Sequence, residues 1–385
     1  MKAANSVLSG YGTTIFEVMS RLAIEKGAVN LGQGFPDVDG PEDLRKLAAD
    51  ALVEGPNQYP PMLGLPELRQ AVAEHDKRFY GLELNWPEEV MITSGATEAL
   101  ADCLFALIEP GDEVVVIEPL YDSYLPIIKR AGGVPVPVRV TPPDWSLPEK
   151  ALEEAFGEKT KLLLLNNPMN PAAKVFSEEE LAFIAKLLVA HDAFAVCDEV
   201  YEHIVFDGRR HHSLITFPGM RERALKIGSA GKSFSLTGWK VGYITAAPDL
   251  LRPVAKAHQF VTFTTPPNLQ KAVAAGLKKD DAYYLDLAGD LERKRNLFDA
   301  GLKKVGFETI DCAGTYFITA DIRPLSNELD DIAFCRKITA EAGVAAVPVS
   351  AFYTTGDADH FVRFCFCKRD DVLAEAIDRL TRYFN

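Results

Sequence analysis

The sequence predicts an α/β protein with a mostly parallel central sheet flanked by helices, plus a smaller α/β domain. Three runs of branched apolar residues, at 113–117, 161–165 and 194–197, are typical of buried strands. Between the last two, Ser177 and three glutamates precede apolar residues at helical spacing, as at a capped helix start. Strands that alternate with helices favour a parallel sheet covered on both faces, with ligands at the carboxyl ends of its strands.

The ends of the chain show a different pattern. Apolar residues at helical spacing in 11–24 and 371–380 predict terminal helices, and several short apolar runs between about 305 and 367 suggest a separate small α/β layer. A Pro-Pro break at 266–267 and the helix after it put the boundary near residue 276. We therefore expect three parts: residues 1–38 as an N-terminal segment belonging to the small domain, 39–275 as the large domain and 276–385 as the small C-terminal domain.

Composition narrows the classes of function. The 385 residues are 48% hydrophobic and 25% charged, an ordinary globular balance, and the net charge is −14. Because so acidic a surface repels nucleic acid and anionic lipid, we expect neither as a partner. There is no signal-peptide pattern and no apolar run of about 18 residues. Six scattered cysteines without a C-x-x-C pair favour a reducing cytoplasm.

Three short motifs suggest a nucleotide or metal site, but each lacks residues that such a site needs. Residues 231–233 (GKS) resemble the end of a phosphate-binding Walker loop, but Lys226 stands where that loop needs glycine. Residues 32–34 (GQG) would open a dinucleotide fingerprint, but Asp37 replaces its third glycine. The histidines at 211 and 212 lack a second ligand pair at metal spacing and are interpreted as solvated loop residues, so no metal site is predicted.

Four segments carry reactive side chains in unusual surroundings. Asp198 ends a buried strand with Tyr201 three residues on, and Lys232 lies between small and apolar residues. Residues 166–171 form a rigid double Asn-Pro turn, and 93–98 begin an apolar helix with small residues. Each alone has an ordinary explanation, such as an ion pair, a solvated lysine, a loop or a helix cap. Together they describe a pocket for pyridoxal 5′-phosphate: a lysine for its aldehyde, an aspartate for its ring nitrogen, an asparagine and a tyrosine for its phenolic oxygen and a helix start for its phosphate.

In addition, the chain resembles the class I/II aminotransferases of the fold-type I pyridoxal-phosphate family over nearly its whole length. Within that family it is most similar to the kynurenine and methionine (glutamine-type) aminotransferases. Of the segments that match the family, the one around Lys232 is the most specific to it. In chain order, the matching segments are 32–37 (GQGFPD), 58–61 (QYPP), 64–69 (GLPELR), 94–99 (SGATEA), 121–124 (YDSY), 167–171 (NPMNP), 198–201 (DEVY), 229–242 (SAGKSFSLTGWKVG) and 361–364 (FVRF).

The resemblance implies roles for matching residues around the reacting atoms. Lys232 would form a Schiff base with the cofactor and then move a proton as acid and base. Asp198 would keep the pyridine nitrogen protonated, so that the ring accepts electrons. Tyr201 and Asn170 would hydrogen-bond the phenolic oxygen, and Tyr121 would stack on the ring.

It also implies phosphate and substrate contacts. Ser229, Lys240 and the helix start at Gly95, Ala96 and Thr97 would hold the phosphate. Tyr59 would reach the phosphate of a neighbouring subunit, which makes a homodimer part of the active site. Arg363 would grip the substrate α-carboxylate, with Asn170 beside it and with Gly34 allowing close backbone approach.

This sequence departs from the family pattern in two places. Lys240 stands where many members have arginine, and Met169, Ala172 and Ala173 replace the more usual His and Thr-Gly around the Asn-Pro step. Phosphate binding then depends on a point charge, and we expect the contacts around the Asn-Pro turn to differ from those of the family.

The predicted activity is transfer of an amino group from an L-amino acid to a 2-oxo acid by a ping-pong mechanism. No second cation for a substrate side chain is evident, and the aromatic run at 260–263 with Tyr11 and Phe16 hints at an apolar pocket. Methionine, aromatic residues, kynurenine or glutamine are the expected donors. A cysteine-conjugate C–S β-lyase using the same lysine remains the alternative. A non-catalytic sensor is disfavoured because no DNA-binding extension is present.

Overall fold

The computed structural model describes residues 2–355 and 358–385, and its centre is a seven-stranded sheet. The strand order is β2-β8-β7-β6-β5-β3-β4, and only β8 runs antiparallel to its neighbours. The mostly parallel sheet is therefore confirmed. The strands are β2 (Val90–Thr93), β3 (Glu113–Glu118), β4 (Val134–Arg139), β5 (Thr160–Asn166), β6 (Phe194–Asp198), β7 (Ala224–Ser229) and β8 (Gly242–Thr245).

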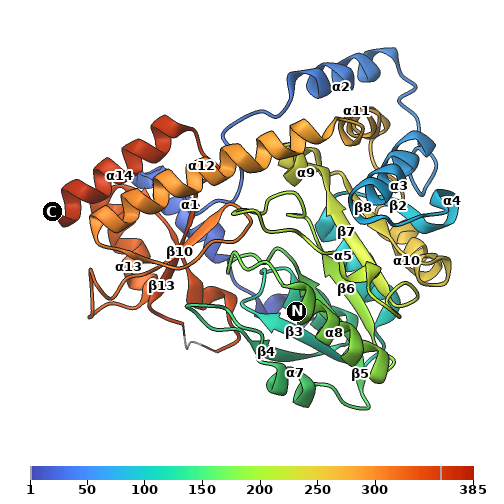
Figure 1. Cartoon of the computed structure of the whole chain (residues 1–385), viewed down its shortest axis with the longest axis horizontal. Coiled ribbons are helices and arrows are strands. Elements are labelled where there is room, and N and C mark those ends of the chain that lie inside the picture. Colours follow the sequence, from blue (N-terminus) through green and yellow to red (C-terminus); the bar gives the residue numbers. More distant parts are fainter. Residues whose placement is uncertain (1, 356–357) are drawn as a thin grey trace.

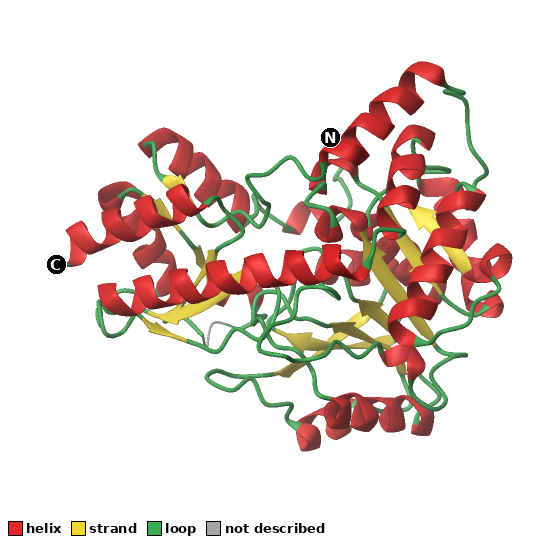
Figure 2. Cartoon of the chain, turned by 45° about the horizontal axis from the view of Figure 1, so that its top comes forward, coloured by secondary structure: helices red, strands yellow, loops and turns green. Residues whose placement is uncertain are grey.

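Helices cover both faces of this sheet (Figure 2). Alternate side chains of β3 point to opposite faces of the sheet. Val114 and Val116 pack with α5, α6 and α10, whereas Val115 and Ile117 pack with α7 and α8. A third apolar cluster joins β2 and β8 to α2, α3 and α11. The helices of this part are α2 (Glu42–Glu54), α3 (Pro66–Tyr80), α4 (Trp86–Glu89), α5 (Ala96–Leu107), α6 (Tyr124–Ala131), α7 (Glu149–Ala155), α8 (Glu178–Ala190), α9 (Ala230–Ser233), α10 (Pro248–Val261) and α11 (Pro267–Leu277).

The expected βαβ unit is present. Ser177 caps α8 between β5 and β6: its side chain accepts from the amide of Glu180, whose carboxylate accepts from the amide of Ser177. This reciprocal pair is the capping box that the sequence indicates, and it starts the helix that returns the chain to the sheet.

A second, smaller layer contains α1 and β1 from the N-terminal part of the chain and α14 at its C-terminal end (Figure 1). An antiparallel sheet of order β12-β13-β10-β9 packs with four helices, and β1 near the N-terminus pairs in parallel with β11. The long helix α12 extends along the molecule from this layer toward α11 (Figure 1). The elements are α1 (Ile15–Lys26), β1 (Val29–Asn30), α12 (Asp281–Val305), β9 (Glu308–Thr309), β10 (Phe317–Asp321), α13 (Asp331–Lys337), β11 (Val344–Ala345), β12 (Val347–Pro348), β13 (Phe361–Cys365) and α14 (Asp370–Phe384).

The terminal helices follow the predicted apolar faces. Met19 of α1 and Leu373 and Leu380 of α14 are buried in one cluster with β10 and β13. No helix in the described ranges is long and apolar enough to cross a membrane.

Candidate active site

A cavity of about 380 Å³ opens where three parallel strands end. Asn166, Asp198 and Ser229 are the last residues of β5, β6 and β7, and all three line it. Phe317 of β10 and Arg363 of β13 line it from the smaller layer. The cavity thus lies at the carboxyl edge of the parallel sheet, where the alternating pattern predicts a ligand site.

Lys232 reaches this cavity from the short helix that follows β7. Its Nζ lies 2.8 Å from the hydroxyl of Tyr316, which itself donates to the carbonyl oxygen of Gly34 at 2.8 Å. Burial lowers the pKa of Lys232. A larger fraction of the amine is therefore unprotonated and nucleophilic than in a solvated lysine.

Asp198 is buried in the same cavity and has two donors. The hydroxyl of Tyr124 donates to Oδ2 at 2.6 Å, and the amide of Val200 donates to Oδ1 at 3.4 Å. Burial raises the pKa of Asp198, and the bond from Tyr124 opposes that rise. A cationic ring nitrogen beside this carboxylate would form the charge pair that burial otherwise lacks.

Arg363 is fully buried and partly committed to the protein. Nη1 donates to Oδ1 of Asn170 at 2.8 Å and Nη2 donates to the carbonyl of Gly32 at 2.7 Å, while Nε has no partner within the described structure. Three aromatic rings surround the guanidinium, with centroids at 3.9, 5.1 and 5.2 Å: Phe317, Phe16 and Phe352. The unpartnered Nε–H and the second hydrogens of the Nη groups suit a carboxylate.

Small residues shape a second corner of the cavity, at the start of α5. Gly95 has φ +81, and a Cβ there would lie 3.1 Å from Cε of Lys240. A Cβ on Gly242 would lie 2.6 Å from the carbonyl carbon of Gly95 and 2.8 Å from the amide of Ala96. The amide of Gly95 donates to the carbonyl of Thr93 at 2.8 Å, so the amides that follow it at the helix start, next to Lys240, form an anion seat. Thr97 and Ser229 also line the cavity.

The other predicted residues divide into two groups. Tyr201 lies in the cavity with its ring edge-on to that of Tyr316, at 5.2 Å, and Tyr121 lines it next to Tyr124. Gly34 lines it too, and a Cβ there would lie 2.6 Å from Phe317. Tyr59 is 83% exposed and does not line this cavity.

Sequence reasoning missed several lining or supporting residues. Tyr316 falls in a run that we interpret from sequence only as a strand of the small layer, so its bond to Lys232 has no local signal. Tyr124 belongs to the YDSY motif, but nothing in the sequence pairs it with Asp198. Of the suggested aromatic pocket, Phe16 lines the cavity, whereas Tyr11 and the run at 260–263 do not.

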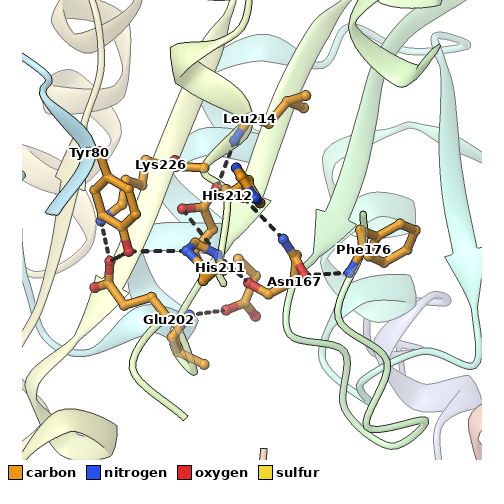
Figure 3. Close-up of polar contacts among 12 residues, drawn as sticks. Tyr80, Asn167, Phe176, Glu202, His211, His212, Leu214 and Lys226 are labelled. Carbon is orange, nitrogen blue, oxygen red and sulfur yellow. Dashed lines mark hydrogen bonds and ion pairs between the residues drawn. The ribbon is translucent and has the colours of Figure 1, made fainter. Parts of the chain in front are cut away.

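The interpretation of His211 as a solvated loop residue is wrong. Its ring is buried, with Nε2 3.2 Å from the carbonyl of Asn167 and Nδ1 3.1 Å from the hydroxyl of Tyr80, and burial lowers its pKa to about 4. Figure 3 shows His211 between Glu202 and Lys226 on one side and Asn167 on the other. A loop with two consecutive histidines looks polar in sequence, but here one of them supports the Asn-Pro turn.

Comparison with known proteins assigns the family. Residues 26–380 match the family described as aminotransferase class I and II. The chain is a class I/II aminotransferase. Its relatives include a methionine aminotransferase from Escherichia coli, 39% identical over 97% of each chain, and the human kynurenine–oxoglutarate transaminase 3, 37% identical over 96% of this chain and 88% of the relative.

Another relative has a different named substrate. A protein named probable N-succinyldiaminopimelate aminotransferase, from Mycobacterium tuberculosis, is 44% identical over 98% of this chain and 97% of its own length. The solved structure of an N-succinyldiaminopimelate aminotransferase from that organism superposes with a TM-score of 0.96 at 45% identity, covering 99% of this chain and 100% of that one.

This aminotransferase depends on pyridoxal 5′-phosphate, as its family does, and acts on amino acids and 2-oxo acids. The cavity fits that cofactor. It combines the partly buried Lys232, the buried carboxylate of Asp198 and an anion seat at which glycines allow close backbone packing.

Proposed function

We propose that this aminotransferase takes L-amino acids with neutral side chains: methionine, aromatic residues, kynurenine or glutamine-like donors. The main support for this proposal is the identity of the cationic side chains that line the cavity. Among the described residues that line it, these are Lys232, Lys240 and Arg363. In the proposed roles these three serve the cofactor aldehyde, its phosphate and the substrate α-carboxylate, so the described lining residues of this chain leave no further cation for a side-chain carboxylate. Phe16 and Phe317 beside Arg363 favour an apolar side chain.

Lys232 is the proposed attachment point for the cofactor aldehyde and, once released, the group that moves a proton from the substrate Cα. The bound cofactor supplies a ring that accepts the electron pair left at Cα. The depressed pKa of Lys232 supports both tasks, since each needs the neutral amine. Without cofactor, the hydrogen bond to Tyr316 holds Nζ of Lys232 at the cavity wall.

The remaining roles follow from position. Asp198 would pair with the cofactor ring nitrogen and keep it protonated, and Arg363 with Asn170 would hold the substrate carboxylate and orient the substrate toward Lys232. Gly34 lets the backbone approach the same carboxylate. The residues proposed to hold the rest of the cofactor are Tyr121 on the ring face, Tyr201 and Asn170 at the phenolic oxygen, and Gly95, Ala96, Thr97, Ser229 and Lys240 at the phosphate.

We further propose that the active unit is a homodimer in which Tyr59 enters the partner subunit's site. Tyr59 is exposed and packs edge-on against Phe263, at 5.5 Å, and Phe260, three residues earlier in the chain, is 82% exposed. Exposed aromatic side chains at this density are typical of an interface. All six cysteines are buried and free, which fits work in a reducing cytoplasm.

A second donor has a specific observation in its favour. The relative named for N-succinyldiaminopimelate shares more identity with this chain than the methionine and kynurenine enzymes do. That substrate joins a 2-amino acid group to a long acylated side chain that carries two carboxylates of its own. The same Arg363 would hold its α-carboxylate, but the described lining residues offer no further cation for the other two, which keeps neutral donors as the first candidate.

Steady-state rates with a panel of donors test the proposal. Methionine, phenylalanine, kynurenine, glutamine, glutamate, aspartate and N-succinyldiaminopimelate are compared by kcat/KM with one 2-oxo acid acceptor. We expect neutral donors to exceed aspartate and glutamate by on the order of tenfold or more, since an unpaired buried carboxylate is costly. A preference for aspartate or glutamate contradicts the proposal, and dominance of the succinylated donor selects the second candidate. Ammonia and pyruvate from a cysteine conjugate without acceptor would instead indicate the β-lyase.

A further inference from the structure

Behind the anion seat, three ionisable side chains meet outside the cavity. Glu98 and Asp102 lie one turn apart on α5, and His258 of α10 lies against both. Nδ1 of His258 is 2.8 Å from Oε1 of Glu98 and 3.7 Å from Oδ2 of Asp102. His258 and Asp102 are 0% exposed, and Glu98 is 9% exposed.

The partners of His258 define its charge. Nε2 lies 2.9 Å from the carbonyl oxygen of Met62, which only accepts, so Nε2 carries a hydrogen. Nδ1 faces the carboxylate of Glu98. Burial alone would lower the pKa of His258, but the bond to Glu98 raises it. Both ring nitrogens thus face oxygen acceptors, and this geometry favours an imidazolium paired with an ionised Glu98.

Asp102 adds no charge to the pair formed by His258 and Glu98. Neither of its oxygens has a hydrogen-bond partner within the described structure, and burial raises its pKa to about 8. It therefore keeps its proton at neutral pH. The group as a whole carries one negative and one positive charge.

Glu98 also reaches the anion seat. Its Oε2 accepts from the amide of Ser94, the residue directly before Gly95, and so holds the turn that begins α5. A carboxylate so close to the seat would repel a bound phosphate if it were unpaired. The imidazolium of His258 offsets that repulsion while Glu98 keeps the turn in place.

The same histidine reaches the proposed dimer surface. Its Nε2 holds the carbonyl of Met62, three residues from Tyr59, and the backbone carbonyl of His258 accepts from the amide of Phe263 at 2.8 Å. His258 thus joins the phosphate-binding turn of one site to the segment that we propose enters the other.

We propose that Glu98 and His258 are positioning residues for the cofactor phosphate: Glu98 orients the turn at Ser94 and Gly95, and His258 neutralises Glu98 so that the seat retains its affinity for a dianion. The inference rests on the proposed placement of the phosphate at this turn. It concerns binding of the phosphate and leaves the choice of amino donor untouched.

Cofactor titration into the cofactor-free full-length chain tests it, with pyridoxal 5′-phosphate and phosphate-free pyridoxal as the two probes. In His258→Gln the new side-chain amide can still donate a hydrogen bond, but the positive charge of the imidazolium is lost. The dissociation constant for pyridoxal phosphate should therefore rise on the order of tenfold, whereas that for pyridoxal should change far less. In Glu98→Gln the side-chain oxygen can still accept from the amide of Ser94, while the charge that His258 offsets is gone, so this variant is the background for the double variant.

The double variant Glu98→Gln/His258→Gln separates charge from structure. With both charges absent, affinity for pyridoxal phosphate should return to within about threefold of native, which additive structural damage would not produce. Equal weakening of both probes in His258→Gln, or no recovery in the double variant, would overturn the inference. If the native chain bound pyridoxal phosphate no better than pyridoxal, the phosphate placement in the proposed function would itself be at fault.

Discussion

Arg363 illustrates how one residue can be both structural and poised for substrate. Two of its N–H groups are used by Asn170 and Gly32, which fix the plane of the guanidinium, and aromatic rings exclude water around it. Within the described structure, its Nε–H is aimed at no protein group. A planar fork that is held in this way can grip a carboxylate without reorganising.

The first prediction concerns this fork. Arg363→Lys should raise KM for the amino donor roughly 10- to 100-fold, because the ammonium cannot serve Asn170, Gly32 and a carboxylate together. Steady-state kinetics with methionine measure the change, and the cofactor dissociation constant serves as the control and should be unchanged. A native KM would show that Arg363 does not hold the substrate.

A second prediction concerns Asp102 and the way in which the free energy of unfolding changes with pH. The pKa of Asp102 is about 8 when folded, whereas the ordinary value of 3.8 applies to the unfolded chain. Between these values the folded state holds a proton that the unfolded state has released. Asp102 therefore makes folding less favourable as pH rises from about 4 to about 8.

Asp102→Asn removes this ionisation. Relative to the native chain, the variant should gain roughly 3 to 4 kcal/mol in free energy of unfolding at pH 8 compared with its difference at pH 5. Urea unfolding of both proteins at the two pH values measures it. A stability difference that is the same at both pH values would mean that Asp102 does not titrate in this window.

At the scale of elements, the anion seat depends on β8 packing closely against the turn before α5. Gly242 begins β8, and its missing side chain leaves room for the backbone of Gly95 and Ala96. The nearby Gly238 faces open space, and a Cβ added there would meet no atom within 4 Å. These two glycines form a matched pair within one segment.

The third prediction uses that pair. Gly242→Ala should displace the turn and weaken pyridoxal phosphate binding on the order of tenfold or more, because the added carbon would overlap the backbone. Gly238→Ala should leave the dissociation constant near native. Equal affinity in both variants would show that close packing at Gly242 does not shape the seat.

Elements and site differ in how far sequence predicts them. The strands β3, β5 and β6, the capped helix α8 and the terminal helices follow from local apolar patterns, so their approximate limits are predictable. The antiparallel direction of β8 and the contacts of Tyr316 and Tyr124 arise from tertiary packing between distant segments. Local pattern carries no signal for such contacts, and for the same reason it cannot reveal that His211 is buried.

At the scale of the whole molecule, the small layer closes one wall of the cavity. Arg363 and Phe317 come from β13 and β10, whereas Lys232 and Asp198 come from the large sheet and the helix after it, so one chain builds most of the site from two layers. Tyr59 alone among the predicted cofactor residues lies outside this cavity. Its role requires a second subunit.

The fourth prediction tests that requirement. Lys232→Ala and Tyr59→Ala should each be impaired as homodimers, the first completely. When the two are unfolded together, refolded and reconstituted, mixed dimers should contain one site with native Lys232 and native Tyr59, and activity should exceed the sum of the separate variants. Purely additive activity would place Tyr59 outside the partner's site.

The proposed chemistry of the whole molecule depends on Lys232, which in this cavity would hold the cofactor aldehyde and then move the proton that lets a neutral amino acid give its amino group to the cofactor. The decisive experiment is the absorbance spectrum of the holoenzyme before and after methionine is added without any acceptor, with ammonia assayed in the same sample. We predict conversion to the pyridoxamine form without ammonia in the native enzyme and no conversion in Lys232→Ala. An unchanged native spectrum, or conversion that persists in Lys232→Ala, would contradict this role.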